Sequence, residues 1–474
     1  MSAAMISRRH ALAGAGVFAL AAACGGRRMT EGRHDVIVVG AGLSGLYATL
    51  LLEELGFDVL VLEASDRLGG RLKTLDHLAG APECGGQTLG PMYARVLKLA
   101  SRFGLDVFER KALLPGNAFY LGERLRSAED LKANPLSALE NAEQEMLPSG
   151  LYNYYLKQVN PLKDLYDWRG AAALSEDGVS IADRFRSAGA SDEAMRLMER
   201  WFDGGGMENM SALFACRKYE AARIETKMLR IAGGSSRLPE AMAAGLKTAP
   251  RLNTPVAAIA YNENGAMLTA SDGSKFAAKQ VFFSAPFSVL RGLVLDPTPR
   301  QPLADAISML PYNHITQVKL AFSAPFWERD GLPPAMYADS FVERVTAAPG
   351  QDGELHYLNV WIKGLKAAEL DQYEEVEIGA RVAAEFERIR PAAKGAVSVA
   401  HVQSWGRNPY SKGAYHFMGV GDVRRYADVL QKPCGPIRWI GEHAAAYQQG
   451  MEGACESAER EVFAILDEIG GKDV

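Results

Sequence analysis

A loop with three glycines at fixed spacing is the first stretch of the chain whose residues could do chemistry. Gly40, Gly42 and Gly45 follow the pattern G-x-G-x-x-G, with Ser44 inside it. Gly40 permits a tight turn, Gly42 lets the backbone approach a pyrophosphate, and Gly45 lets a helix pack closely on the preceding strand. A helix that begins in this loop directs its partially positive N-terminus at phosphate groups. The loop therefore predicts a dinucleotide site that contains Gly40, Gly42, Ser44 and Gly45.

The segments on either side of the loop support this interpretation. Residues 34–39 form a continuous apolar run, which is typical of a buried parallel strand. A helical apolar pattern begins at Leu43 and stops at Gly56, and a second apolar strand, 59–62, ends at Glu63. In such a βαβ unit Glu63 is placed to accept hydrogen bonds from ribose hydroxyls, and its charge would repel a 2′-phosphate. This context favours a nucleotide site over a plain structural turn.

Further landmarks follow Glu63 in a fixed order. They are 65–71, 85–91, 233–239, 284–286, Trp405, 409–415 and 441–454. In these stretches the chain resembles the flavin amine oxidase family, which includes monoamine oxidases and L-amino acid oxidases. The resemblance runs from His34 almost to the C-terminus and implies FAD as the cofactor.

The resemblance also implies which residues contact FAD. Arg71 is expected to help hold the phosphates, Val256 to meet the adenine through its backbone, and Glu442 to hydrogen-bond the ribityl chain. Met451 is expected to open a helix whose N-terminus faces the isoalloxazine and favours the negative charge of a reduced flavin. A stretch that lies along the flavin contributes Gly86, Gln87, Thr88 and Leu89.

Two departures from the family concern the flavin itself. Many members attach the flavin covalently through a cysteine, but this chain has Ala414 at that place, so we expect non-covalent FAD. Gln317 stands where a lysine usually holds a water near flavin N5. Lys319 lies on the same strand face and would take that place if the register slipped. An amide can hold a water but supplies no positive charge, which puts fast reaction with oxygen in doubt.

The substrate end departs from the family as well. Tyr415 matches one wall of an aromatic cage, whereas the other wall falls at Gly450. A half-open cage favours a bulky or long substrate, unless Tyr447 replaces the missing wall. Tyr93 stands where some amino-acid oxidases carry an arginine for the substrate carboxylate, which argues against α-amino acids.

From the resemblance we predict FAD-dependent oxidation of a small-molecule amine. A hydride passes to flavin N5, and the resulting imine is hydrolysed to a carbonyl compound, with O2 or a periplasmic electron-carrier protein as acceptor. The alternatives are an L-amino acid oxidase, a C–C dehydrogenase or desaturase on the same fold, and a non-catalytic flavoprotein. The residues assigned to catalysis are Gln317, Tyr415 and Trp405.

Size and composition set outer limits on fold and partners. A chain of 474 residues favours two domains. A net charge of -5 gives no basic stripe for nucleic acid, and the five cysteines have neither metal-ligand nor disulfide-framework spacing. We expect an α/β protein with a Rossmann-type FAD domain of glutathione-reductase-like topology and a discontinuous α+β substrate domain of sheet plus helices. The FAD domain is expected at 34–91, 225–300 and 431–474, and the substrate domain at 92–224, mainly helical, and 301–430.

The first 33 residues form a predicted signal peptide and linker. Arg8 and Arg9 precede an apolar run, 11–23, that is too short to span a bilayer. The pair resembles a twin-arginine signal, although Ala11 stands where phenylalanine is usual. Cys24 permits processing to a lipoprotein, and an ordinary cleavage site is the alternative. We expect a bacterial protein that is exported to the periplasm as a folded holoprotein and forms a homodimer, with Cys24 as the candidate site of a lipid anchor.

Overall fold

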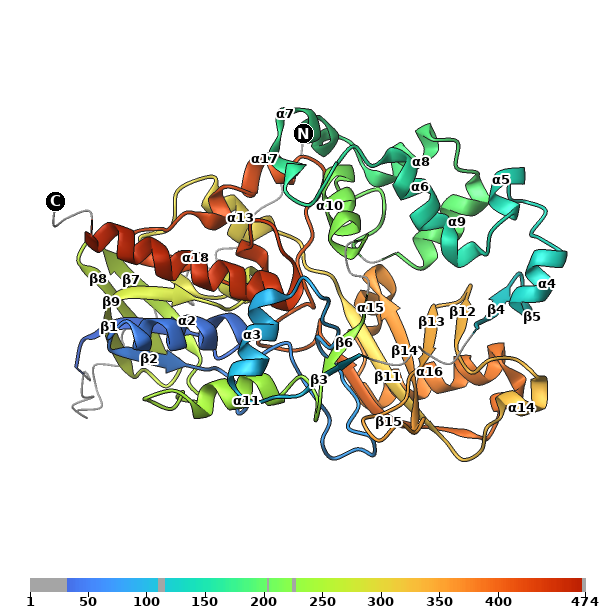
Figure 1. The fold of residues 1–474 in the computed structure, drawn as a ribbon, viewed down its shortest axis with the longest axis horizontal. Helices are drawn as coiled ribbons and strands as arrows, with labels where there is room; N and C mark the ends of the chain where they lie inside the picture. Colours follow the sequence, from blue (N-terminus) through green and yellow to red (C-terminus); the bar gives the residue numbers. More distant parts are fainter. Residues whose placement is uncertain (1–31, 110–115, 203, 224–226, 471–474) are drawn as a thin grey trace, which may run out of the picture.

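The computed structural model describes residues 32–109, 116–202, 204–223 and 227–470, and places two sheets side by side with a group of helices above one of them (Figure 1). The predicted signal peptide, with Arg8, Arg9 and Cys24, lies outside the described residues. Among the described residues, no helix is both long and apolar enough to cross a membrane.

The first sheet has seven strands drawn from three separate parts of the chain. Its strand order is β10-β7-β8-β9-β1-β2, with β16 also paired to β9. β1 pairs in parallel with β2 and with β9, and β16 pairs in parallel with the other side of β9. Strands β7, β8 and β9 form an antiparallel meander. This mixed sheet confirms the predicted α/β class. The strands are β1 (His34–Val39), β2 (Val59–Leu62), β7 (Val256–Asn262), β8 (Gly265–Ala270), β9 (Lys275–Phe283), β10 (Val294–Asp296) and β16 (Ile437–Trp439).

Helices cover one face of this sheet. Val36 and Val38 of β1 pack with α2 (Leu43–Glu54) and α18 (Gly450–Gly470), while Ile37 and Val39 join the core on the opposite face, because successive strand residues alternate in direction. The helix α3 (Ala94–Arg102) also packs here through Val96, beside α11 (Arg237–Ala244). It therefore belongs with the first sheet and not with the substrate domain, to which the range 92–224 assigned it.

The second sheet has the order β15-β11-β14-β13-β12-β4-β5 and lies against α16 (Glu375–Ile389). The helix presents Ile378, Val382 and Phe386 to the sheet, a stripe with four-residue spacing. The range 92–224, expected to be mainly helical, also supplies β4 and β5, which form a short hairpin with Glu123 at positive φ (60). The strands are β4 (Ala118–Leu121), β5 (Arg124–Arg126), β11 (Ile315–Phe322), β12 (Met336–Ala338), β13 (Arg344–Ala347), β14 (Tyr357–Lys363) and β15 (Val397–Ser404).

Short helices form a third region between the sheets and the surface. Serine caps start three of them, since Ser127 accepts from the backbone N–H of Asp130, Ser180 from that of Asp183 and Ser191 from that of Ala194. The helices are α4 (Ala128–Ala133), α5 (Asn141–Gln144), α6 (Leu151–Val159), α7 (Ala171–Leu174), α8 (Ile181–Ser187), α9 (Asp192–Arg200) and α10 (Ala212–Arg223).

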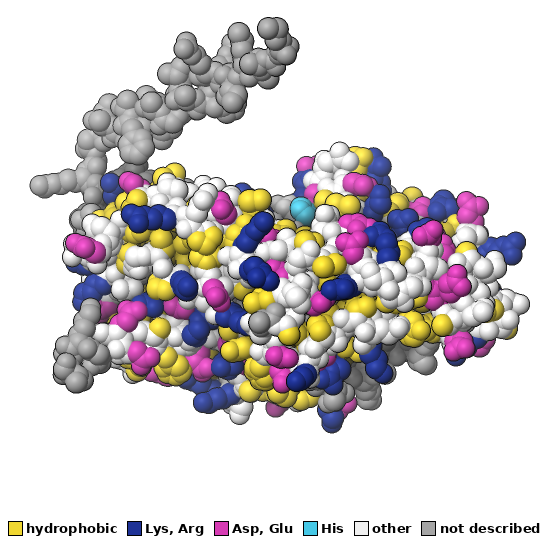
Figure 2. Space-filling model, turned by 90° about the horizontal axis from the view of Figure 1, so that it is seen from above, with side chains coloured by type: hydrophobic (Ala, Val, Ile, Leu, Met, Phe, Trp, Pro, Cys, Tyr) yellow, Lys and Arg dark blue, Asp and Glu magenta, His cyan; other side chains and the backbone are white. Residues whose placement is uncertain are grey.

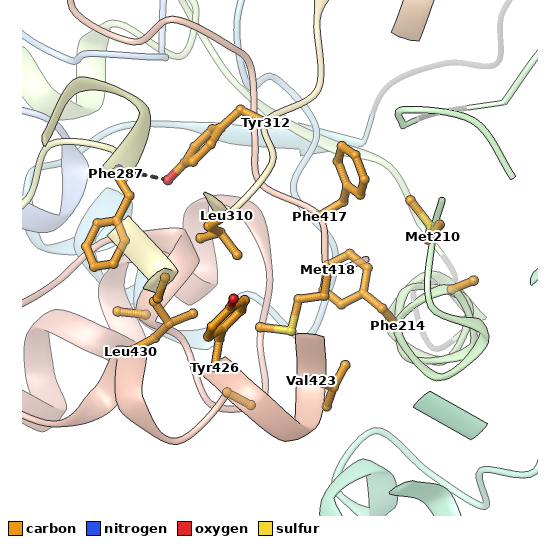
Figure 3. Packing of buried hydrophobic residues seen from close by; sticks show 14 of the residues in the cluster. Met210, Phe214, Phe287, Leu310, Tyr312, Phe417, Met418, Val423, Tyr426 and Leu430 are labelled. Carbon is orange, nitrogen blue, oxygen red and sulfur yellow. Dashed lines mark hydrogen bonds between the residues drawn. The ribbon is translucent and has the colours of Figure 1, made fainter. Parts of the chain in front are cut away.

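One continuous apolar core joins the helical region to the first sheet. Figure 3 shows Phe214 of α10 near Phe417 and Met418, in the same cluster as Leu310, Tyr312 and Tyr426. The backbone N–H of Phe287 donates to the hydroxyl of Tyr312 at 3.0 Å, so the polar end of this ring is satisfied inside the core. The shared core fixes the helical region relative to the nucleotide-binding sheet.

The remaining helices and the small third sheet connect these parts. The connecting elements are β3 (Val107–Glu109) paired with β6 (Leu229–Ile231), and α12 (Phe287–Leu290), α13 (Leu303–Met309), α14 (Trp327–Asp330), α15 (Gly364–Leu370) and α17 (Asp422–Tyr426).

On the face seen in Figure 2, Lys and Arg side chains are interspersed with Asp and Glu side chains.

Candidate active site

A cavity of about 500 Å³ lies between the two sheets. Its lining comes from the ends of β1, β2 and β9 on one side and from β11 and β14 on the other. In open α/β sheets, ligands bind outside the carboxyl ends of parallel strands, and this cavity occupies that place.

The glycine loop shapes the end of the cavity beside β1. A Cβ atom on Gly45 would lie 2.0 Å from the carbonyl oxygen of Gly40, so only glycine lets α2 approach the strand this closely. Gly40 itself has φ +105, and a Cβ there would lie 2.7 Å from the hydroxyl of Ser284. Gly42 caps α2 and lines the cavity with Ser44, and a Cβ on it would meet no protein atom within 4 Å. The predicted cradle for a pyrophosphate is therefore present at the helix N-terminus.

Glu63 is held rigidly at the same end. Its carboxylate accepts hydrogen bonds from the backbone N–H of Ala41 (2.7 Å) and of Ser65 (2.9 Å), and from the Ser65 hydroxyl (2.8 Å). Both oxygens are thus oriented by donors, and Glu63 lines the cavity together with Val256. The structure brings the predicted ribose and adenine residues to one place.

Arg71 and Glu442 form an ion pair in the middle of the lining. Nη1 of Arg71 donates to Glu442 Oε1 (2.8 Å) and to the carbonyl of Ala414 (2.7 Å), and Nδ1 of His416 donates to Glu442 Oε2 (2.7 Å). Burial alone would raise the pKa of Glu442, but the charges of His416 and Arg71 outweigh it and hold that pKa well below its ordinary value. Glu442 therefore stays ionised and keeps Arg71 in place along the lining.

The opposite end of the cavity is built from the second sheet. Gln317 and Trp405 line it, and their side chains donate to the same acceptor, the carbonyl of Cys84, at 2.7 and 2.9 Å. Tyr415 lines this cavity as well, and so does Trp361 of β14, which pairs directly with Gln317 across the strands. Sequence reasoning missed Trp361, because only the register between β11 and β14 shows that it stands beside Gln317.

Gly450 and Met451 line the cavity where α18 begins. Gly450 has φ +55, a conformation that strains other residues, so the backbone itself favours glycine here. A Cβ on Gly450 would lie 3.5 Å from the hydroxyl of Tyr93, which does not line the cavity but closes this corner from α3.

Tyr447 does not replace the missing wall of the aromatic cage. It lies outside the cavity lining, is 38% exposed, and packs edge-on against Tyr166 with ring centroids 5.1 Å apart. Its backbone N–H donates to Glu456 at 3.2 Å, which holds the chain at this residue. Tyr447 is therefore directed away from the position that the sequence interpretation gave it.

The predicted flavin-side stretch reaches the cavity only in part. Gly86 lines it, but Gln87, Thr88 and Leu89 do not. Gln87 accepts a hydrogen bond from Arg230 at 2.6 Å, and the backbone of Leu89 pairs with Leu229. In place of these three residues, Cys84 and Gly85 contribute to the lining.

The donor set fits a flavin dinucleotide. Glycine-loop amides suit a pyrophosphate, a fixed carboxylate suits ribose hydroxyls, and the far end offers an amide and three aromatic rings. Within the described residues, no group of three or more His, Cys, Asp or Glu side chains could hold a metal ion.

Comparison with known proteins identifies matches over nearly the whole chain. The family described as flavin-containing amine oxidoreductase matches residues 43–466. Flavin-containing amine oxidase B of Mus musculus is 23% identical over 92% of this chain and 87% of its own length. The flavin-dependent L-tryptophan oxidase of Lentzea aerocolonigenes is 26% identical over 92% of this chain and 99% of its own length.

Solved structures show the same fold. Putrescine oxidase bound to putrescine has a TM-score of 0.74 at 23% identity, covering 92% of this chain and 99% of that protein. Cyclohexylamine oxidase from Brevibacterium oxydans has a TM-score of 0.77 at 20% identity, covering 93% of this chain and all of that protein (100%).

The Glu63 geometry predicts the outcome of a single-atom change. In Glu63→Gln one carboxylate oxygen becomes an NH2 group, which must face an N–H or O–H donor on either side of the residue. We expect FAD to bind about ten- to a hundredfold more weakly, since a lost charged hydrogen bond costs about 1.5–3 kcal/mol. Fluorescence titration of the apoprotein with FAD measures this. Glu263→Gln, in the exposed turn after β7, is the matched control, and wild-type affinity in Glu63→Gln would place the ribose elsewhere.

Proposed function

The chain belongs to the flavin-containing amine oxidoreductase family, and we propose that it binds FAD non-covalently and oxidises a small-molecule amine. The observation that carries the proposal is that one cavity holds both the nucleotide-binding residues, such as Glu63, and an aromatic end formed by Trp361, Trp405 and Tyr415. A substrate at that end would therefore meet the reactive part of a cofactor whose nucleotide lies along the glycine loop.

The flavin supplies a hydride acceptor at N5, and the imine product is hydrolysed to a carbonyl compound. The residues of this chain bind the amine and exclude water. An alkylamine with a pKa of ~10.4 costs about 4.6 kcal/mol to deprotonate at pH 7, at 1.36 kcal/mol per unit. A dry pocket shifts such a group by roughly 3–5 units, so Trp361, Trp405 and Tyr415 can favour the neutral amine without a dedicated base.

An α-amino acid is a second candidate substrate. Curated relatives include L-amino acid and L-tryptophan oxidases. In this chain the ammonium of Lys218 lies 5.1 Å from the centroid of the Tyr415 ring, which lines the cavity. The positive charge of Lys218 would attract a substrate carboxylate and repel a cationic group elsewhere on the substrate.

The electron acceptor in this proposal is O2 or a periplasmic electron-carrier protein. A C–C dehydrogenase and a non-catalytic flavoprotein remain the competing functions, and both would use the same cavity differently. Which substrates reduce bound FAD separates amine oxidation from these two competing functions.

We expect the flavin to leave the denatured protein. Ala414 lines the cavity and offers no thiol, and the buried Cys84 and Cys455 have pKa values raised by burial, which disfavours their reactive thiolates. Acid precipitation followed by absorbance of supernatant and pellet tests this. Yellow colour that stays with the polypeptide would show a covalent link and contradict the proposal.

The central experiment is anaerobic mixing of the holoprotein with matched substrates. We expect primary amines to bleach the oxidised flavin spectrum, and their carbon isosteres to leave it unchanged. Tyr415→Ala should lower kcat/KM for all amines about tenfold or more, because it removes an apolar contact worth roughly 1–3 kcal/mol. Tyr447→Ala, which alters an aromatic side chain outside the cavity, should leave kcat/KM close to wild type.

Each other outcome selects a competitor. Bleaching by the carbon isostere alone would identify a C–C dehydrogenase, and bleaching by no substrate would favour a non-catalytic role. Faster bleaching by the α-amino acid than by the amine with the same side chain would favour the second candidate, and Lys218→Gln should then reverse that order.

We propose that the protein is exported. The support is the arginine pair, Arg8 and Arg9, before a short apolar run, and the twin-arginine route accepts proteins that have already folded around a cofactor. Lipidation at Cys24 and a homodimeric state belong to the same proposal and rest on sequence alone.

Replacing Arg8 and Arg9 together by lysine tests the route. We expect the double variant to remain in the cytoplasm with FAD bound, because charge is kept but the arginine pair is lost. Cell fractionation with flavin absorbance measures both properties. Normal export of the double variant would rule out a twin-arginine signal.

A further inference from the structure

The side-chain amide of Gln317 is held by three partners, two in the second sheet and one, Cys84, in the segment between β2 and α3. Its Nε2 donates to the carbonyl of Cys84 (2.7 Å). Its Oε1 accepts from Nζ of Lys319 (3.3 Å) and from Nδ2 of Asn359 (3.0 Å). Gln317 is only 2% exposed, so these contacts decide how the amide is oriented.

The orientation follows from the chemistry of the partners. A backbone carbonyl can only accept and an ammonium group can only donate, so the nitrogen must face Cys84 and the oxygen must face Lys319. Both lone pairs of Oε1 are then used, and one N–H of Nε2 is used. The single hydrogen-bonding group that remains is the second N–H, and Gln317 lines the cavity whereas Lys319 and Asn359 do not.

Lys319 is the charged member of the cluster. Strand alternation places Gln317 and Lys319 on the same face of β11, and Lys319 is 3% exposed and outside the cavity lining. Its ammonium also donates to the carbonyl of Glu83 at 2.7 Å. Burial lowers the pKa of Lys319, and the neighbouring Cys84 and Glu83 oppose that effect. The amide of Gln317 therefore lies between the ammonium of Lys319 and the cavity.

We propose that Gln317 and Lys319 act as a pair, in which Gln317 presents an N–H donor to the flavin end of the cavity and Lys319 polarises that donor from behind. Lys319 is a positioning residue, since it donates to Gln317 and does not itself line the cavity. The inference rests on the proposed binding of FAD in this cavity. Its consequence is that the site offers positive potential to the flavin although no cationic side chain of β11 reaches the cavity.

A positive potential at this place stabilises the reduced flavin, which carries additional electrons. We expect Lys319→Met to lower the ratio of reduced to oxidised bound FAD about tenfold at a fixed dye potential, which is about 30 mV for a two-electron couple. The measurement is an anaerobic dye-linked titration of the holoprotein and requires no substrate. Lys319→Gln keeps a hydrogen-bond donor without the charge and should shift the ratio in the same direction.

A double-mutant cycle tests whether the effect passes through the amide. In a Gln317→Met background, Lys319→Met should change the ratio by about threefold or less, because the hydrogen bond that polarises the donor is gone and only the direct electrostatic effect of the charge remains. Lys73→Met is the matched control, since Lys73 is a neighbouring half-buried lysine that donates to Gln403 at 2.6 Å and not to Gln317. It should leave the ratio near wild type.

Three results would overturn the pairing. They are a wild-type ratio in both Lys319 variants, an additive effect in the Gln317→Met background, and an equal shift in Lys73→Met. Failure of the proposed function would be visible separately, because substrates would then fail to reduce the flavin while the dye titration of bound FAD still reported on Lys319.

Discussion

The backbone carbonyl of Cys84 accepts the hydrogen bonds that hold the two domains together at the cavity. Gln317 and Trp405 both donate to it from the second sheet, and Lys319 donates to the adjacent carbonyl of Glu83. The segment is itself pressed against the first domain, since a Cβ on Gly85 would lie 2.0 Å from the carbonyl of Arg71. Because one oxygen orients Gln317 of β11 and Trp405, which directly follows β15, the aromatic end of the cavity and the cofactor segment cannot move independently.

This dependence explains which parts of the site a sequence could predict. The glycine loop and Glu63 are local, because a few neighbouring residues determine both the backbone shape and the ligand chemistry. A carbonyl acceptor carries no residue identity, so nothing in the sequence marked Cys84 as the common partner. Likewise, the position of Trp361 beside Gln317 depends on a strand register that only the folded sheets define.

The wrong expectations have the same physical origin. Helical residues near α3 were assigned by sequence position, whereas Val96 packs where the first sheet has an open apolar surface. The cage was predicted to be half-open unless Tyr447 replaced the missing wall. The backbone of Tyr447 is instead held by Glu456, which leaves the ring on the outside beside Tyr166. In both cases contacts between distant segments overrode a local pattern.

The start of α18 shows how those distant contacts set the flavin end of the cavity. The loop before Gly450 is held from two sides. Glu456 accepts hydrogen bonds from the backbone N–H groups of residues 446–448. Arg217 donates to the backbone carbonyls of the same three residues at 3.3 Å. The guanidinium carbon of Arg217 lies 4.1 Å from the centroid of the Trp168 ring. Burial lowers the pKa of Arg217 to about 10, so the side chain remains charged at neutral pH. Arg217 belongs to the helical region, whereas Glu456 belongs to α18, beside the first sheet. The helix end that lines the cavity through Met451 is therefore fixed by both domains, and a change in the helical region would reach the cofactor through this loop.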